Sequence, residues 1–332
     1  MKTSIWTNPD VLVALISGIV AMILAIWNFL SGRKTQADIE ILKNELAEKK
    51  SENDARREYE FEARKKLYQE YEPLLFQLME ASDNALHRIK SLARTARHEN
   101  LNENGWLSQF NYYTKSTIYK LFVPIAIYQI MQKKLTLVDI AVDSSIGLRY
   151  KMAKQIYISY TDDFEFARTY QNIEYDPNIL NWQEKRKDNP ACFWRQGLPM
   201  GLLDKTIEIL IEKDESGKER VISYGEFEKK LSHIESDNTS DINLSKDIFF
   251  NFHPQKRPIL WRILITQSIL LRAFLEFKSV KPENINNQML RNIVLNFDAD
   301  NIKEFIWSND KNKSHEYEEP FKVAIEYLKK RF

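Results

Sequence analysis

The sequence predicts an all-α protein with a single N-terminal transmembrane helix, a helical, short coiled-coil-like stalk, and a multi-helix domain with at most a minor β-hairpin. Residues 11–30 form a run of 20 positions without a charged side chain. The chain has only 8 glycines in 332 residues, whereas β-rich and Rossmann-type folds use glycine at their turns. Apolar residues make up 43% of the chain, which is enough to build a core and excludes wholesale disorder.

Charge and cysteine content exclude several functional classes. The 48 basic and 47 acidic residues leave a formal net charge of +1. Nucleic-acid-binding proteins carry a clear basic excess, so a nucleic-acid partner is not expected. The single cysteine, Cys192, rules out a disulfide within the chain and suits a reducing compartment. No nucleophile signature surrounds it, so we expect a structural thiol.

Residues 11–30 are the predicted membrane span. As a helix, this run is about 30 Å long, which is the thickness of a bilayer's hydrocarbon layer. Trp6 and Trp27 lie near its two ends, where aromatic rings favour the interface. A cleaved signal peptide would have a shorter apolar region followed by a small-residue cleavage site. A buried core helix would rarely be apolar on every face.

The charges that flank the span predict its orientation. Residues 1–10 contain one basic residue, Lys2. The sequence after the span contains Arg33, Lys34, Lys43, Lys49 and Lys50. Because positive residues stay inside, we expect residues 1–10 to be extracytoplasmic and the C-terminal domain to be cytoplasmic. The predicted location is the cell inner (plasma) membrane, with the lipid bilayer as a partner.

One face of the span carries small residues. At helical spacing this face contains Ala14, Ser17, Gly18, Ala21, Ala25 and Asn28. Small residues let two membrane helices approach closely, and Asn28 could donate a hydrogen bond across the interface. We therefore expect a homo-oligomer, although small residues also occur in membrane helices that do not associate.

The segment 31–72 is predicted to be a charged helical stalk. Its charges alternate in sign, and no proline or glycine occurs from Arg33 to Glu72. Ile39, Leu42 and Leu46 form a short heptad-like seam. Pro73 is expected to end this helix, because proline lacks the backbone N–H that a helix interior requires.

Residues 73–332 are predicted to form a helical domain. Apolar periodicity and capping residues indicate helices over 74–97, 112–133, 135–160, 258–277, 287–295, 301–307 and 317–331. Pro124 is expected to kink or break its helix. The helix that begins at Pro258 should be the central core helix, and a buried Arg262 on it would need a carboxylate partner.

Three shorter segments have signals of their own. Residues 205–223 fit a helix, with a hairpin around the turn at 214–217 as the second choice. Ser223 and Glu226 have the spacing of a capping box at a helix start. Asp162 and Glu165 have the same spacing. Residues 236–244 are expected to be a polar linker.

A basic stripe is the first candidate binding site. His87, Lys90, Arg94 and Arg97 recur at spacings of 3, 4 and 3, which places them on one helix face. Such a stripe could bind a phosphate, an RNA backbone or anionic lipid headgroups. The simpler interpretation is a solvated face whose neutralising acids lie on neighbouring elements, and that is the more common case.

Acidic and histidine patterns do not predict a metal, a cofactor or a catalytic residue. Asp139 and Asp143 are spaced i, i+4, and with Asp162 or Asp163 they could hold a divalent cation. Such pairs are usually surface residues, so no metal site is expected. The histidines lack metal-ligand spacing, and the glycines do not form a phosphate loop.

Two loop segments combine aromatic, cationic and amide side chains. One contains Trp194 and Arg195, and the other, at 253–257, contains Arg257. Loops often carry binding residues, so both segments are candidate anion-binding or partner-binding sites. Anchoring of long loops explains them too, and we favour that structural interpretation.

The predicted function is a single-pass, membrane-anchored interaction, scaffold or sensor-effector protein that has a protein partner and no catalytic activity. In architecture alone, the anchor, stalk and helical domain are similar to the single-span accessory or effector proteins of bacterial anti-phage systems, which implies a role in defence. The alternative is a membrane-anchored enzyme that acts on a phosphorylated or nucleic-acid substrate. That enzyme would bring the basic stripe together with Asp139 and Asp143 in one pocket, whereas a recruiter would expose an apolar patch.

Overall fold

The computed structural model describes residues 9–102, 104–135, 139–168, 174–179, 181–235, 248–297, 299–310, 312 and 314–332. Within these ranges some side chains, those at 28 and 30–38 among them, lie outside the description. The chain divides into two compact units, Met1–Glu62 and Ala63–Phe332. Helix α1 (Pro9–Arg97) contributes to both. The described secondary structure is mainly helical, which confirms the predicted all-α class.

In the first unit, the large apolar side chains of α1 are exposed. Eleven large apolar side chains described between Val13 and Phe29 are each 48–71% exposed. The described apolar stretch Val13–Trp27 is about 22 Å long as a helix, shorter than the roughly 30 Å of a bilayer's hydrocarbon layer. The structure thus shows a short apolar helix in place of the full predicted span at 11–30. The side chains at 11, 12, 28 and 30 lie outside the described set.

Helix α9 (Pro258–Phe277) is the described helix that is long and apolar enough to cross a membrane. Of its apolar window, 83% is buried inside the fold, which marks it as a core helix. It begins and ends where the sequence predicted, with Pro258 in its first turn. The Gln196 side chain accepts hydrogen bonds from the backbone N–H groups of Ile259 (3.0 Å) and Leu260 (3.1 Å). These bonds satisfy two donors that a helix N-terminus leaves unpaired.

The prediction that Pro73 ends the stalk helix is wrong, because α1 continues through it to Arg97. Pro73 and Gln69, the residue one turn earlier, are both exposed, so water can bind the Gln69 carbonyl that proline leaves without a donor. Leu67 and Tyr71 before the proline are buried in the same core as Leu78 after it. Packing along this face therefore holds the helix together. Pro124 likewise lies inside a continuous α2 (Tyr112–Leu135).

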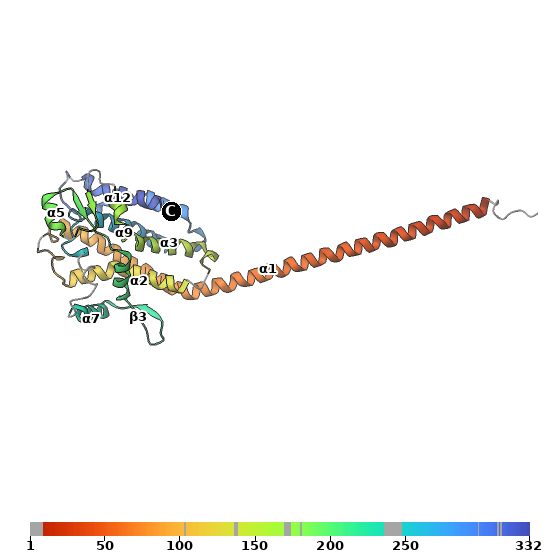
Figure 1. Ribbon diagram of the computed structural model, residues 1–332, viewed down its shortest axis with the longest axis horizontal. Coiled ribbons are helices and arrows are strands. Elements are labelled where there is room, and N and C mark those ends of the chain that lie inside the picture. Colours follow the sequence, from red (N-terminus) through yellow and green to blue (C-terminus); the bar gives the residue numbers. More distant parts are fainter. Residues whose placement is uncertain are drawn as a thin grey trace, which may run out of the picture. The chain divides into compact units, whose positions relative to one another are not determined.

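The core of the second unit is a stack of helices around α9. Helix α9 packs against α3 (Ser144–Ser159), α4 (Asp163–Ala167), α10 (Asn287–Leu295) and α12 (Ser314–Lys329). Figure 1 shows α3, α9 and α12 lying side by side. Helix α2 packs on α3 and on the C-terminal part of α1. Most of the α9 side chains are fully buried, which explains why its sequence is apolar on nearly every face.

The second unit also contains shorter described elements. The helices are η2 (Ile140–Val142), α5 (Trp182–Asp188), α6 (Met200–Glu208), α7 (Tyr224–Glu235), η3 (Pro282–Asn284) and α11 (Ala299–Lys303). Strand β1 (Glu174–Asp176) pairs in parallel with β2 (Cys192–Trp194), and β3 (Ile211–Lys213) pairs antiparallel with β4 (Glu219–Val221). The polar linker predicted at 236–244 lies outside the described residues.

The second-choice hairpin at 205–223 is the observed structure, and the helix expected there stops early. Helix α6 ends at Glu208, and β3 and β4 follow. The Asp214 carboxylate accepts hydrogen bonds from the backbone N–H groups of Ser216 (2.8 Å) and Lys218 (2.9 Å), and Gly217 has φ +79°. A positive φ favours glycine, so this turn chemistry overrides the helical pattern.

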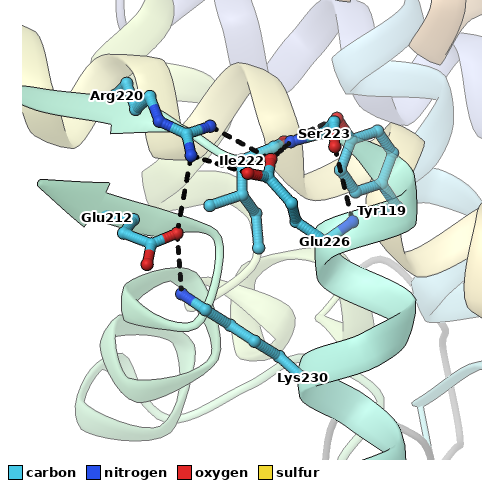
Figure 2. Close-up of polar contacts among 7 residues, drawn as sticks. All are labelled: Tyr119, Glu212, Arg220, Ile222, Ser223, Glu226 and Lys230. Atoms are coloured by element: carbon cyan, nitrogen blue, oxygen red, sulfur yellow. Dashed lines mark hydrogen bonds and ion pairs between the residues drawn. The ribbon is translucent and has the colours of Figure 1, made fainter. Parts of the chain in front are cut away.

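The capping box at Ser223 and Glu226 is confirmed (Figure 2). The Ser223 N–H donates to the Glu226 carboxylate at 2.7 Å, and the Glu226 N–H donates to the Ser223 hydroxyl at 3.4 Å. Arg220 on β4 donates two further hydrogen bonds to the same carboxylate, at 2.6 and 3.0 Å. Hydrogen bonds from Arg220 and from the Ser223 N–H hold the pKa of Glu226 well below its usual range. The start of α7 is thus tied to the hairpin.

Two other predicted helix starts differ from expectation. The helix expected over 135–160 is interrupted, and α3 begins only after Asp143, which caps its first turn. Helix α4 does begin after Asp162, but that side chain makes no cap hydrogen bond. Its carboxylate instead accepts hydrogen bonds from the Tyr327 hydroxyl (2.5 Å) and from Arg331 (2.9 Å). A tertiary contact with α12 has replaced the local cap.

Candidate functional site

The basic stripe of α1 forms one wall of a cavity of about 330 Å³ in the second unit. Three of its four residues, His87, Lys90 and Arg94, line the cavity. Arg97 is not among the lining residues. The rest of the described lining comes from Arg88 and Ser91 on α1, Lys120 on α2, and Glu304 directly after α11.

Arg88 is the most firmly held cation of the cavity. Arg88 is only 7% exposed. The guanidinium donates a 2.8 Å hydrogen bond to the Ser116 hydroxyl on α2, and its central carbon lies 4.5 Å from the centre of the Tyr113 ring. The hydroxyls of Tyr113 and Ser91 share a hydrogen bond at 3.3 Å. Arg88 is therefore fixed against α2.

The described lining of the cavity carries four side chains that are normally cationic and a single carboxylate. That carboxylate, Glu304, forms an ion pair with Lys90, with an N–O distance of 2.6 Å. Burial, and then the charge of Arg88, lower the pKa of the Lys120 ammonium. Within the described residues, no hydrogen bond or ion pair joins the side chain of Arg94 or Lys120 to a carboxylate. Lys90 of the stripe is thus paired with a carboxylate that a neighbouring element supplies.

Sequence reasoning missed Arg88 and Lys120. Arg88 lies next to the stripe on the side of α1 that faces the core. A search for basic residues at exposed helix positions therefore does not include it. The signal that could have found it is the spacing of Arg88 and Ser91, two polar residues three apart beside an apolar face. Lys120 comes from another helix, and only tertiary packing brings it to Arg88.

The two loop segments do not contribute to this cavity. Trp194 is buried, with the Arg186 guanidinium 5.8 Å from its ring centre. Arg195 lies 3.8 Å from the Asp163 carboxylate. Arg257 is buried and donates a hydrogen bond to the Ile248 carbonyl. Trp194 ends strand β2, so the first segment is not wholly a loop.

A second cavity lies where the two loop segments approach each other. It has a volume of about 560 Å³, and its lining includes Phe193 from the first segment, which covers 193–197, and Pro254 from the second. The indole rings of Trp261 and Trp307 also line it, as does the ion pair of Arg262 with Glu319. The cavity has mainly aromatic and proline walls, and neither Trp194 nor Arg195 is among its lining residues.

Asp139 and Asp143 do not form the paired face that their spacing suggested. Asp139 lies before η2 and outside any helix, and Asp143 is the N-cap of α3. The Asp143 carboxylate accepts hydrogen bonds from the Ser145 N–H (2.9 Å) and the Tyr68 hydroxyl (2.6 Å). Among the described residues, no group of three or more His, Cys, Asp and Glu side chains could hold a metal ion.

Cys192 and the small-residue face of α1 can also be placed. Cys192 is buried in β2, and burial raises the pKa of its thiol, which disfavours the nucleophilic thiolate form. Ala14, Ser17, Ala21 and Ala25 are exposed on α1, with open space around Gly18. The side chain of Asn28 lies outside the described set.

Comparisons of the chain with protein-family models, with curated proteins and with solved structures find no match.

Proposed function

We propose that this chain is a single-pass membrane protein whose second unit is a helical interaction or sensor-effector module. The observation that carries the proposal is the run of large apolar side chains on α1 between Val13 and Phe29, each about half exposed or more. Full burial of one such side chain is worth about 1.5–3 kcal/mol. A contiguous apolar surface of this size on the charge-free segment 11–30 of α1 matches a bilayer.

The proposed orientation places the second unit in the cytoplasm. It follows from the excess of Lys and Arg after the span over the single Lys2 before it. The unit then lies on the side of the membrane where its buried, unpaired Cys192 stays reduced. The expected role in anti-phage defence stays a prediction from architecture.

Binding without catalysis is favoured over the enzyme alternative. That alternative needs carboxylates beside the basic stripe to act as acids, bases or metal ligands. Asp143 instead caps α3 and accepts a hydrogen bond from Tyr68, and neither it nor Asp139 is among the residues that line the basic cavity. Glu304, the acid among the described lining residues, is paired with Lys90. The cavity thus has binding groups but lacks a recognisable set of reacting groups.

Arginines in the span test the membrane anchor. The full chain should stay in the membrane pellet after a carbonate wash, and Val20→Arg with Ile23→Arg should release most of it. Each arginine at the centre of a membrane helix costs about 2.5–3.5 kcal/mol. Leu42→Arg with Leu46→Arg, two exposed positions of the charged segment, is the matched control and should leave the chain in the pellet. Carbonate release of the unmodified chain would contradict the proposal.

Crosslinking in native membranes tests self-association through the small-residue face. Ala21→Leu with Ala25→Leu should reduce the crosslinked dimer more than Asn28→Leu does, because close packing over the whole face must dominate. An interhelical hydrogen bond contributes about 0.6 kcal/mol on average, or about threefold in the association constant. Ile16→Leu with Ile23→Leu, on the opposite face, is the control. If these controls reduce the dimer as much as the alanine changes, the proposed face is wrong.

A further inference from the structure

The described lining of the cavity beside the basic stripe has an excess of positively charged side chains over carboxylates. Arg88, Lys90, Arg94 and Lys120 converge there, and the only carboxylate among the described lining residues is Glu304. Arg88 is buried and Lys90 and Lys120 are half-buried, and like charges that are withdrawn from water repel one another more strongly than in open water. We propose that this cavity is a binding site for a phosphate monoester group, a role that does not depend on whether the chain is anchored in a membrane.

Arg88, Ser91 and Lys120 are the residues proposed to contact the phosphate oxygens. The hydrogen bond to Ser116 uses one donor group of a guanidinium that has five N–H donors, and the Tyr113 ring fixes its plane. Ser116 and Lys120 are four residues apart on α2, so both lie on the helix face that meets α1. A cation already held in place loses little conformational entropy on binding, which favours affinity.

Size and chemistry select the ligand class. A volume of about 330 Å³ is near the small end of the range of ligand pockets, roughly 300–1,000 Å³. It suits a phosphate with a small substituent. The described lining contains no Phe, Tyr or Trp on which a base could stack, which disfavours nucleotides. A phosphate monoester carries close to two negative charges at neutral pH, which suits the local excess of cations.

Glu304 is proposed to be the competitor of the ligand. It pairs with Lys90 at 2.6 Å, and its side chain is about half exposed, so it can leave the cavity without disturbing the core. While it stays, it lowers the positive potential that a phosphate would meet. Removal of its charge should therefore strengthen binding, whereas removal of a cation should weaken it.

Calorimetric titration of the full chain in a mild non-ionic detergent, with inorganic phosphate as the probe, tests the proposal. One stoichiometric site is expected. Lys120→Gln should weaken binding about tenfold, and Glu304→Gln should strengthen it about threefold. Lys115→Gln, on the same helix but not in the cavity, is the matched control and should change nothing. The expected effects of Lys120→Gln and Glu304→Gln are opposite in direction, so a general loss of folding cannot produce both. Circular dichroism verifies the folding of each variant.

A second arm distinguishes a lipid headgroup from a free metabolite. The same titrations are run with glycerol 3-phosphate and with a soluble short-chain phosphatidic acid, which share the phosphate monoester. Tighter binding of the lipid, still weakened by Lys120→Gln, identifies a headgroup site. Equal or weaker binding of the lipid identifies a free phosphate ester. Flat titrations with every probe, or phosphate binding that is unchanged in both Lys120→Gln and Glu304→Gln, would overturn the proposal.

Discussion

Glu319→Ala is expected to lower the free energy of unfolding of the second unit by about 3 kcal/mol. Its partner, Arg262, is only 1% exposed on the central helix α9. The guanidinium donates to the Glu319 carboxylate, at 3.2 Å from Nε, and to the carbonyl of Phe166. Without Glu319, this buried cation would lose the carboxylate that balances its charge. The estimate lies at the lower end for buried ion pairs, because Glu319 is partly exposed.

Urea unfolding of the full chain in detergent, followed by far-ultraviolet circular dichroism, measures this effect. Arg262→Met with Glu319→Leu should recover much of the loss, since apolar pairs of similar volume often replace buried ion pairs without a net cost. Lys322→Ala removes an exposed ion pair with Glu318 on the same helix and should change stability by less than about 0.5 kcal/mol. Equal effects of Glu319→Ala and Lys322→Ala would show that the buried pair contributes no more than a surface pair.

Gly197→Ala should destabilise the second unit by about 2–3 kcal/mol. A Cβ atom at this position would lie 2.4 Å from the Tyr160 carbonyl oxygen and 2.9 Å from the Asp163 Cβ. Neither neighbour can move easily. Tyr160 is fully buried, and its hydroxyl donates to Gln267 at 2.8 Å. Asp163 is 1% exposed and accepts a hydrogen bond from the Gly197 N–H at 3.3 Å.

Gly201→Ala is the matched control for this substitution. Gly201 lies four residues further along, in the first turn of α6, and nothing occupies the space where its Cβ would be. Alanine is favoured over glycine in a helix by about 0.5–1 kcal/mol, so this variant should be unchanged or slightly more stable. Thermal unfolding of the two variants, compared with the unmodified chain, gives the difference. Similar melting temperatures for both variants would mean that the loop at Gly197 can relax.

Local signals in the sequence determined several parts of the fold. The apolar segment that begins at Pro258 is observed as α9, and Arg262 on it has the carboxylate partner that burial demands. The capping box of Ser223 and Glu226 is formed as its spacing predicted. These features depend on backbone groups and side chains a few residues apart, or on the cost of burying an unpaired charge, so periodicity and spacing are enough to predict them.

Tertiary packing decided the features in which two segments compete for the same groups. Asp143 caps α3 and also accepts a hydrogen bond from the distant Tyr68. The Asp162 carboxylate makes no cap hydrogen bond and accepts one from Tyr327 instead. At Pro73, burial of the residues on either side outweighs one lost backbone hydrogen bond.

The basic cavity shows the same division. The sequence by itself determined that His87, Lys90 and Arg94 share a helix face, because helical periodicity fixes that face. Only the tertiary structure decided that Lys120 joins them and that Glu304 neutralises Lys90 alone. The physical reason is that electrostatic energy depends on distances between helices, and these distances are set by the packing of apolar side chains that carry no charge.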